Sequence, residues 1–107
     1  MEDKIKKIAD HYGFAKQSRQ LNEECAELIQ AVNKYYRFHE GLVINDDNLT
    51  CISDNNMLIQ NIVEEIADVE IMLNQMKYLL NINPQAVEQI KVKKIDRQFI
   101  RIEKEGK

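Results

Sequence analysis

Apolar residues recur every three or four positions along most of the chain, which is the spacing of one face of an α-helix. Only three Gly and one Pro interrupt the 107 residues, so the sequence offers few turns that could join strands. The spacing predicts four helices, at about residues 3–12, 16–38, 56–80 and 84–103. We expect an all-α fold in a single domain over residues 1–107.

The expected helix ends coincide with residues that stop helices. Gly13 has no side chain and permits the left-handed turn that ends many helices, and Gly41 stands in the same place after the second helix. The residue before a proline is pushed out of the α region, so the third helix should end before Pro84, which can begin the fourth.

The connection between the second and third helices differs in composition. Residues 42–56, LVINDDNLTCISDNN, are rich in Asn and Asp, which bond to their own backbone and favour turns. The sequence therefore predicts a long loop over residues 42–56. The alternative is a small hairpin in which LVIN and LTCI flank the polar turn residues.

Four carboxylates lie on or beside the apolar rows of the two long helices. At about 100° per residue, Glu24 falls on the flank of the second helix's row, and Glu27 lies one step further round. On the third helix, Glu65 falls within the row and Asp68 at its edge. We expect Glu65 to be buried, where an isolated carboxylate is costly unless a positive charge is close.

Two such pairs could bind a hard cation. Residues three apart on a helix are neighbours, so each pair offers two sets of oxygens to one ion. Facing pairs from two helices would form a Mg²⁺ site, which Mn²⁺ could also occupy. The alternative is an ordinary solvated acidic surface, a description that fits Glu23, Glu64 and Glu70 taken singly.

Composition and charge narrow the function classes. Charged residues make up 31% of the chain and hydrophobic residues 44%, the balance of a folded soluble protein. The net charge of -3 argues against a nucleic-acid scaffold. No apolar run approaches the roughly 20 residues that cross a bilayer, and the N-terminus lacks a signal peptide's apolar core. We expect a cytoplasmic protein with no membrane or nucleic-acid partner, in which Cys25 and Cys51 are free thiols.

Two motifs carry a resemblance to a known superfamily. EECAE at residues 23–27, followed by EIAD at residues 65–68, resembles the E-E-x-x-E and E-x-x-D signature of the MazG-like all-α nucleoside triphosphate pyrophosphohydrolases. KKIDRQFIRIE at residues 93–103 is similar to the pattern of that family's fourth helix. The resemblance covers about residues 17–103 and implies a four-helix bundle with a long loop between the two acidic helices.

The resemblance implies a hydrolase that holds Mg²⁺ with carboxylates. The ligands would be Glu24, Glu27, Glu65 and Asp68, with Glu23 as a further acidic residue of the first motif. Either Glu24 or Glu27 would hold the attacking water or accept its proton. The implied reaction cleaves a nucleoside triphosphate between the α and β phosphates, giving a monophosphate and pyrophosphate, and its role could be house-cleaning of non-standard nucleotides.

The resemblance also implies phosphate contacts and self-association. Lys94 and Arg97 match basic positions that approach the nucleotide phosphates, and their alternative is a solvated basic surface or ion pairs with Glu103 and Glu105. Family members form dimers or pairs of dimers, and the long amphipathic helices carry more apolar surface than one small bundle covers, so we expect a homo-oligomer. The alternative function is a non-catalytic, dimerising helical interaction protein.

Overall fold

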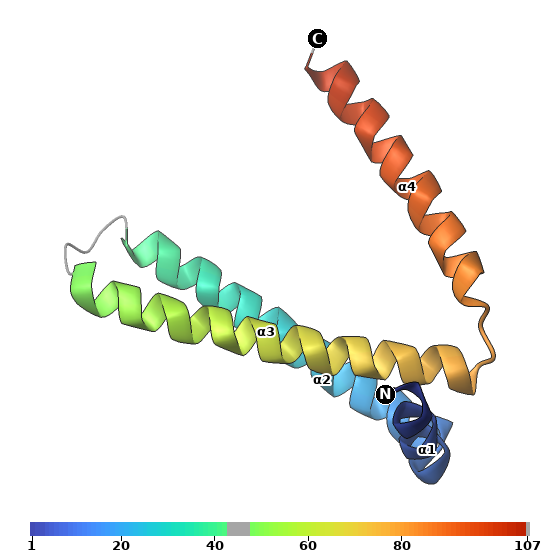
Figure 1. The fold of residues 1–107 in the computed structure, drawn as a ribbon. Coiled ribbons are helices and arrows are strands. Elements are labelled where there is room, and N and C mark those ends of the chain that lie inside the picture. Colours follow the sequence, from blue (N-terminus) through green and yellow to red (C-terminus); the bar gives the residue numbers. More distant parts are fainter. Residues whose placement is uncertain (43–47, 107) are drawn as a thin grey trace.

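The fold is all-α. The computed structural model describes the backbone of residues 1–42 and 48–106, and the side chains of residues 1–39 and 55–106. Its helices are α1 (Glu2–Tyr12), α2 (Phe14–Leu42), α3 (Asn48–Leu79) and α4 (Pro84–Glu105) (Figure 1). No strand occurs in these ranges, so the expected fold class is confirmed.

The connection between α2 and α3 is shorter than the sequence predicts. Because α3 begins at Asn48, residues 48–56 of the expected loop are helical, and the LTCI half of the alternative hairpin is helical too. Residues 43–47 lie outside the described part of the chain. Asn or Asp costs only up to about 0.7 kcal/mol relative to Ala in a helix interior. Extension of a helix that is already nucleated can offset that cost, so composition was a poor guide here.

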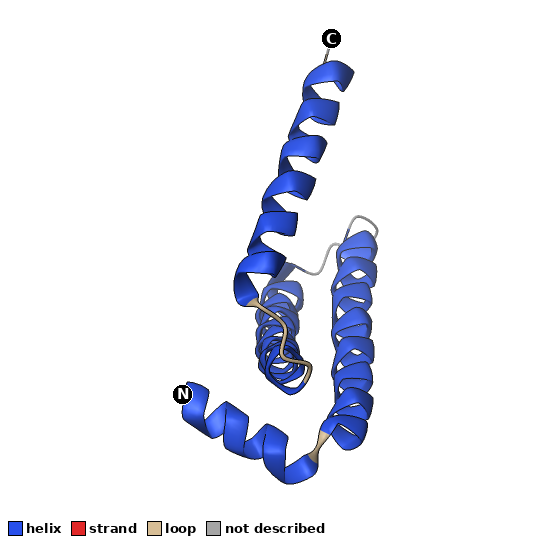
Figure 2. Ribbon diagram, turned by 90° about the vertical axis from the view of Figure 1, so that its right-hand side faces the viewer, coloured by secondary structure: helices blue, strands red, loops and turns tan. Residues whose placement is uncertain are grey.

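Gly13 alone separates α1 from α2. Its φ of 83° and ψ of 168° lie in a region that residues with a side chain rarely adopt, and its N–H donates to the carbonyl of Ala9 at 2.8 Å. The chain bends sharply here, so α1 lies across one end of the α2–α3 pair (Figure 2). The helix stop predicted at Gly13 is confirmed, although α2 resumes at once with Phe14.

Asn81 ends α3 in the left-handed conformation, with a φ of 55°. The N–H of Ile82 donates to the carbonyl of Lys77 at 2.8 Å, and the N–H of Asn81 donates to that of Tyr78 at 3.1 Å. These two bonds are the Schellman arrangement, which satisfies the last carbonyls of a helix. The turn redirects the chain away from α3.

The next helix starts from a capped end. Asn83 accepts a hydrogen bond from the N–H of Gln85 at 2.9 Å, and Pro84 occupies the first helical position, where its missing N–H costs nothing. From there α4 projects away from the other helices (Figure 1). Val87 is the only residue of α4 that is even half-buried within the described chain. The expected four helices are present, but within the described part of one chain α4 does not pack with the other three as a four-helix bundle requires.

Among the side chains that the structure describes, the buried ones gather where α1 meets the α2–α3 pair. Three of them are apolar, namely Ala9, Met72 and Met76. The other two, Gln17 and Gln75, are polar and bonded to each other. Elsewhere α2 and α3 cover each other along a single row, which leaves their outer faces in solvent. None of the described helices carries an apolar stretch long enough to span a membrane.

Candidate metal centre

The antiparallel pairing of α2 and α3 brings the two acidic motifs level with each other. Glu24 and Glu27 come from α2, and Glu65 comes from α3. Each offers one carboxylate oxygen, and these three oxygens all lie within 4.8 Å of one another. Oxygens this close could share one hard cation such as Mg²⁺ or Ca²⁺.

Glu65 lies in the α3 row that faces α2, as its sequence position predicts, but it is half-buried rather than buried. The reason is that a two-helix pair has no third element here to cover the row. One oxygen of Glu65 and one of Glu24, the Oε2 atom in each case, are nevertheless buried and have no hydrogen-bond partner. A buried oxygen without a partner is costly, and a bound cation would supply that partner.

Neighbouring carboxylates raise the pKa of two members of this region, Glu65 and Asp68. The pKa of Glu65 rises from 4.5 to about 7, first because its surroundings are poorly solvated, then because Glu27 repels its charge and shares a hydrogen bond that requires a proton. Asp68 and Glu24 add smaller repulsions. A cation bound among these groups would reverse the shift, because it favours their charged forms.

Asp68 lies beside this cluster without belonging to the group of three. Its side chain is exposed, and its pKa is raised by partial desolvation and by the neighbouring Glu24 charge and hydrogen bond. The structure thus brings Asp68 to Glu24 across the helix pair. Glu23 is exposed on α2 and is not one of the three clustered carboxylates.

Gln20 is a neighbour of the cluster that the motifs did not reveal. Its Nε2 donates to Oε1 of Glu24 at 2.8 Å, one helical turn away. This bond holds one oxygen of Glu24, while the other oxygen is the buried one without a partner. The four-residue spacing between Gln20 and Glu24 is the sequence signal for this contact.

The basic residues predicted to bind phosphate are elsewhere. Lys94 and Arg97 are exposed on α4, which leaves the helix pair at its far end (Figure 1). Neither forms an ion pair with Glu103 or Glu105. The one ion pair among the described side chains joins Lys91 and Glu88 at 3.1 Å. Within one chain, therefore, the carboxylates and these two cations do not meet.

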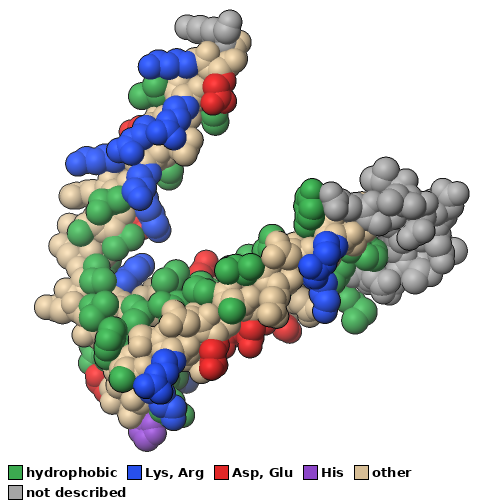
Figure 3. Space-filling view, turned by 180° about the vertical axis from the view of Figure 1, so that it is seen from behind, with side chains coloured by type: hydrophobic (Ala, Val, Ile, Leu, Met, Phe, Trp, Pro, Cys, Tyr) green, Lys and Arg blue, Asp and Glu red, His purple; other side chains and the backbone are tan. Residues whose placement is uncertain are grey.

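Acidic and apolar side chains occupy opposite edges of the helix pair. In Figure 3 the acidic side chains of the two long helices gather mainly along the edge that faces away from α4. Hydrophobic side chains line the edge that faces α4. The exposed side chain of Glu27 leaves the candidate metal centre open to solvent on one side.

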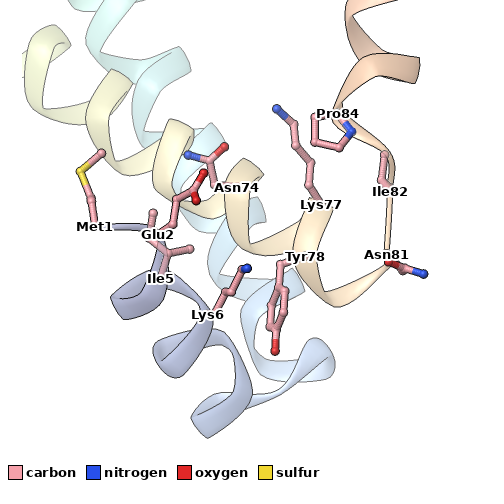
Figure 4. Close-up of a pocket in the computed structure, with 10 residues that line it drawn as sticks. All are labelled: Met1, Glu2, Ile5, Lys6, Asn74, Lys77, Tyr78, Asn81, Ile82 and Pro84. Atoms are coloured by element: carbon pink, nitrogen blue, oxygen red, sulfur yellow. The ribbon is translucent and has the colours of Figure 1, made fainter.

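A separate cavity of about 380 Å³ lies where α1, the end of α3 and the start of α4 meet (Figure 4). Lys6, Lys77 and Tyr78 are among the residues that line it, and none of the four predicted metal ligands does. Tyr78 donates its hydroxyl to Asp10 at 2.7 Å, and the Lys6 ammonium lies 5.7 Å from the centre of the Tyr78 ring. These contacts hold α1 against α3, so the cavity belongs to a structural junction.

Comparisons with known proteins give no match. No family model, no curated protein and no solved structure matches the chain.

Proposed function

We propose that the protein is a Mg²⁺-dependent nucleoside triphosphate pyrophosphohydrolase of the MazG-like kind, acting in the cytoplasm. The observation that carries the proposal is the convergence of Glu24, Glu27 and Glu65 within 4.8 Å, from the two motifs that resemble the family signature. The unpartnered buried oxygens of Glu24 and Glu65 support it, since a cation satisfies both.

The carboxylates of the cluster would have two roles, metal binding and activation of the attacking water. Glu24, Glu27, Glu65 and Asp68 would hold the metal, which screens the triphosphate charge and activates a water when bound. Glu27 is the exposed member of the cluster and Glu24 has one oxygen fixed by Gln20, so Glu27 is the better placed of the two to hold or deprotonate that water.

The bond that is cleaved follows from the resemblance and not from the carboxylates. A carboxylate-held cation serves attack at any phosphate, so the cluster by itself supports phosphoanhydride hydrolysis in general. The family's chemistry selects attack at the α-phosphorus. Such an enzyme would release nucleoside monophosphate and pyrophosphate, and removal of non-standard nucleotides is the role that we propose for it.

A panel of ribo- and deoxynucleoside triphosphates with Mg²⁺ tests the reaction. We expect pyrophosphate and monophosphate in equal amounts, and ¹⁸O from labelled water in the monophosphate. The Glu65→Gln variant is the negative control, and Glu103→Gln on exposed α4 is the matched surface control. Orthophosphate and a diphosphate as first products would refute the bond choice.

We further propose that the protein is a homo-oligomer, a dimer or a tetramer. Large apolar side chains remain in solvent on all four helices, among them Ile29 at 60%, Val63 at 52% and Phe99 at 61% exposed. Monomers rarely expose apolar surface of this extent. Light scattering at micromolar concentration should give a mass above 12.6 kDa, and a 12.6 kDa species alone would contradict the proposal.

The same exposed surface favours the second candidate, a non-catalytic dimerising interaction protein. In that case the acidic cluster would bind no metal, and Mg²⁺ or Mn²⁺ would leave the melting temperature unchanged. Metal binding to the folded state alone would raise it. Absence of hydrolysis across the nucleotide panel, together with no metal effect, would favour the interaction protein.

A further inference from the structure

One face of α4 is a regular apolar row that nothing in the described part of the chain covers. Its residues follow one another at spacings of three, four and three, and each is 55–64% exposed: Val92, Ile95, Phe99 and Ile102. This spacing is that of a helix seam that packs against another helix. Most of the stability of a helix in a protein comes from packing of its apolar face, and this row of α4 has no such packing within the described part of the chain.

A second uncovered row runs along α3. It lies beside the row that faces α2, and its members are 42–52% exposed: Ile59, Val63, Ile66 and Leu73. Their spacings of four, three and seven match the same seam pattern, with Glu70 at the position between the last two. Both rows therefore have the spacing of a helix face that packs against another helix.

We propose that α4 of one copy packs along this α3 row of a second copy, and that the second copy returns its α4 in the same way. In one chain α4 stands away from the other helices, beyond the turn at Asn81 (Figure 1, Figure 2). One reciprocal exchange covers both rows in both copies. Exchange of a terminal element across a short connection is a common route to symmetric dimers.

The opposite charges of α3 and α4 favour a second copy of this chain as the partner of each row. Helix α3 carries five acidic residues and one basic residue, whereas α4 carries six basic and four acidic residues. Glu70, within the α3 row, is exposed and has no ion pair among the side chains that the structure describes. Lys91 and Lys94 lie on one side of the α4 row. Lys91 is ion-paired with Glu88 in its own chain, so the ammonium group of Lys94 is the one that can approach such a carboxylate.

This inference rests on the proposed self-association and is independent of the proposed hydrolysis. Its test is disulfide formation between singly substituted copies, in a Cys25→Ser, Cys51→Ser background whose helical content is first checked by circular dichroism. Phe99→Cys protein is mixed with Ile59→Cys, Ile66→Cys or Leu73→Cys protein of distinguishable mass. Three partners are used because a disulfide forms only when the Cα atoms come within about 7 Å.

The controls separate this arrangement from others. Arg97→Cys lies on the opposite side of α4 from Phe99 and should couple poorly, while Ile95→Cys provides a second position in the α4 row. We expect a covalent heterodimer between an α4-row cysteine and at least one α3-row cysteine, formed several-fold faster than with Arg97→Cys.

Three results would overturn the proposal. They are coupling no faster than with the Arg97→Cys control, preferential coupling between two α3-row copies, and a purely monomeric protein. None of these readouts requires turnover, so a protein that hydrolyses no nucleotide can still exchange α4. Conversely, if the protein hydrolyses nucleotides but its α4-row cysteines do not couple to the α3-row cysteines, the proposed function stands and the α4 exchange is refuted.

Discussion

Gln17 donates its side-chain Nε2 to Oε1 of Gln75 at 2.7 Å, and both side chains are almost completely buried. The bond joins α2 to α3 beside the point where α1 crosses them. Paired amides inside a protein satisfy each other, whereas a single buried amide is left without a partner. The pair therefore fixes the register of the two helices that carry the acidic motifs.

Removing one member of this pair should destabilise the fold. Gln75→Ala leaves the Gln17 amide buried and unpartnered, which costs about 1–3 kcal/mol. Urea unfolding would show this loss against Gln89→Ala, an exposed control on α4. The double variant Gln17→Leu, Gln75→Leu should recover most of the stability, because neither position then holds a polar group. Equal stability of Gln75→Ala and the control would contradict a structural role for the bond.

The carboxylate cluster predicts a metal effect on thermal stability. Mg²⁺ or Mn²⁺ should raise the melting temperature of the native chain, since the ion binds only the folded state. Glu65→Gln should raise the melting temperature without metal, because it relieves repulsion with Glu27, and should lose the response to metal. Glu103→Gln should behave like the native chain. An unchanged metal response in Glu65→Gln would remove Glu65 from the ligand set.

The raised pKa of Glu65 predicts a pH dependence with a definite sign. Between its ordinary value of 4.5 and about 7, the folded chain binds more protons than the unfolded chain. The free energy of unfolding without metal should therefore fall as the pH rises through this window. Denaturation at a series of pH values would measure the fall, and Glu65→Gln should flatten it. If the free energy of unfolding of the native chain instead rose with pH over this window, and that of Glu65→Gln did not, the pKa of Glu65 would not be raised by folding.

Asp68→Asn should abolish turnover and leave the helical content intact. The side chain is exposed, so the substitution costs little stability, but it removes a charge beside Glu24 that the proposed metal set uses. Circular dichroism and pyrophosphate release would separate the two effects. Full activity in this variant would end its assignment as a ligand.

Lys94→Ala should mainly raise KM if its ammonium contacts substrate phosphates. Because Lys94 lies far from the cluster within one chain, that contact requires a second copy, and the effect should be absent from any monomeric variant that remains active. Steady-state kinetics with Lys93→Ala as the neighbouring control would measure it. A fall in kcat with unchanged KM would indicate a different role.

The sequence predicted most of the secondary structure and the position of the acidic cluster. Helical periodicity placed Glu65 on the inner row of its helix and brought it opposite Glu24 and Glu27, because facing rows of paired helices determine which side chains meet. The glycine at position 13 and the proline at position 84 marked helix boundaries correctly. Helix periodicity and helix boundaries depend on residues close together in the chain, so they can be predicted from the sequence.

Features that depend on tertiary structure were not predictable in this way. The Asn- and Asp-rich segment favours turns locally, yet residues 48–56 continue α3 because a long helix propagates through weak residues. The departure of α4 depends on the turn at Asn81 and on what α4 packs against, neither of which periodicity specifies. Glu65 is less covered than its inner position suggests for the same reason, since a helix pair has only two members.

The apolar core at the crossing of α1, α2 and α3 consists of one small alanine and the thioethers of Met72 and Met76. Methionine is flexible and fills irregular space, so this core can adjust to small movements of α1. Oxidation of either methionine to the sulfoxide would place a polar group where the three helices meet. Oxidation at these two positions would therefore weaken the packing of α1 against α2 and α3.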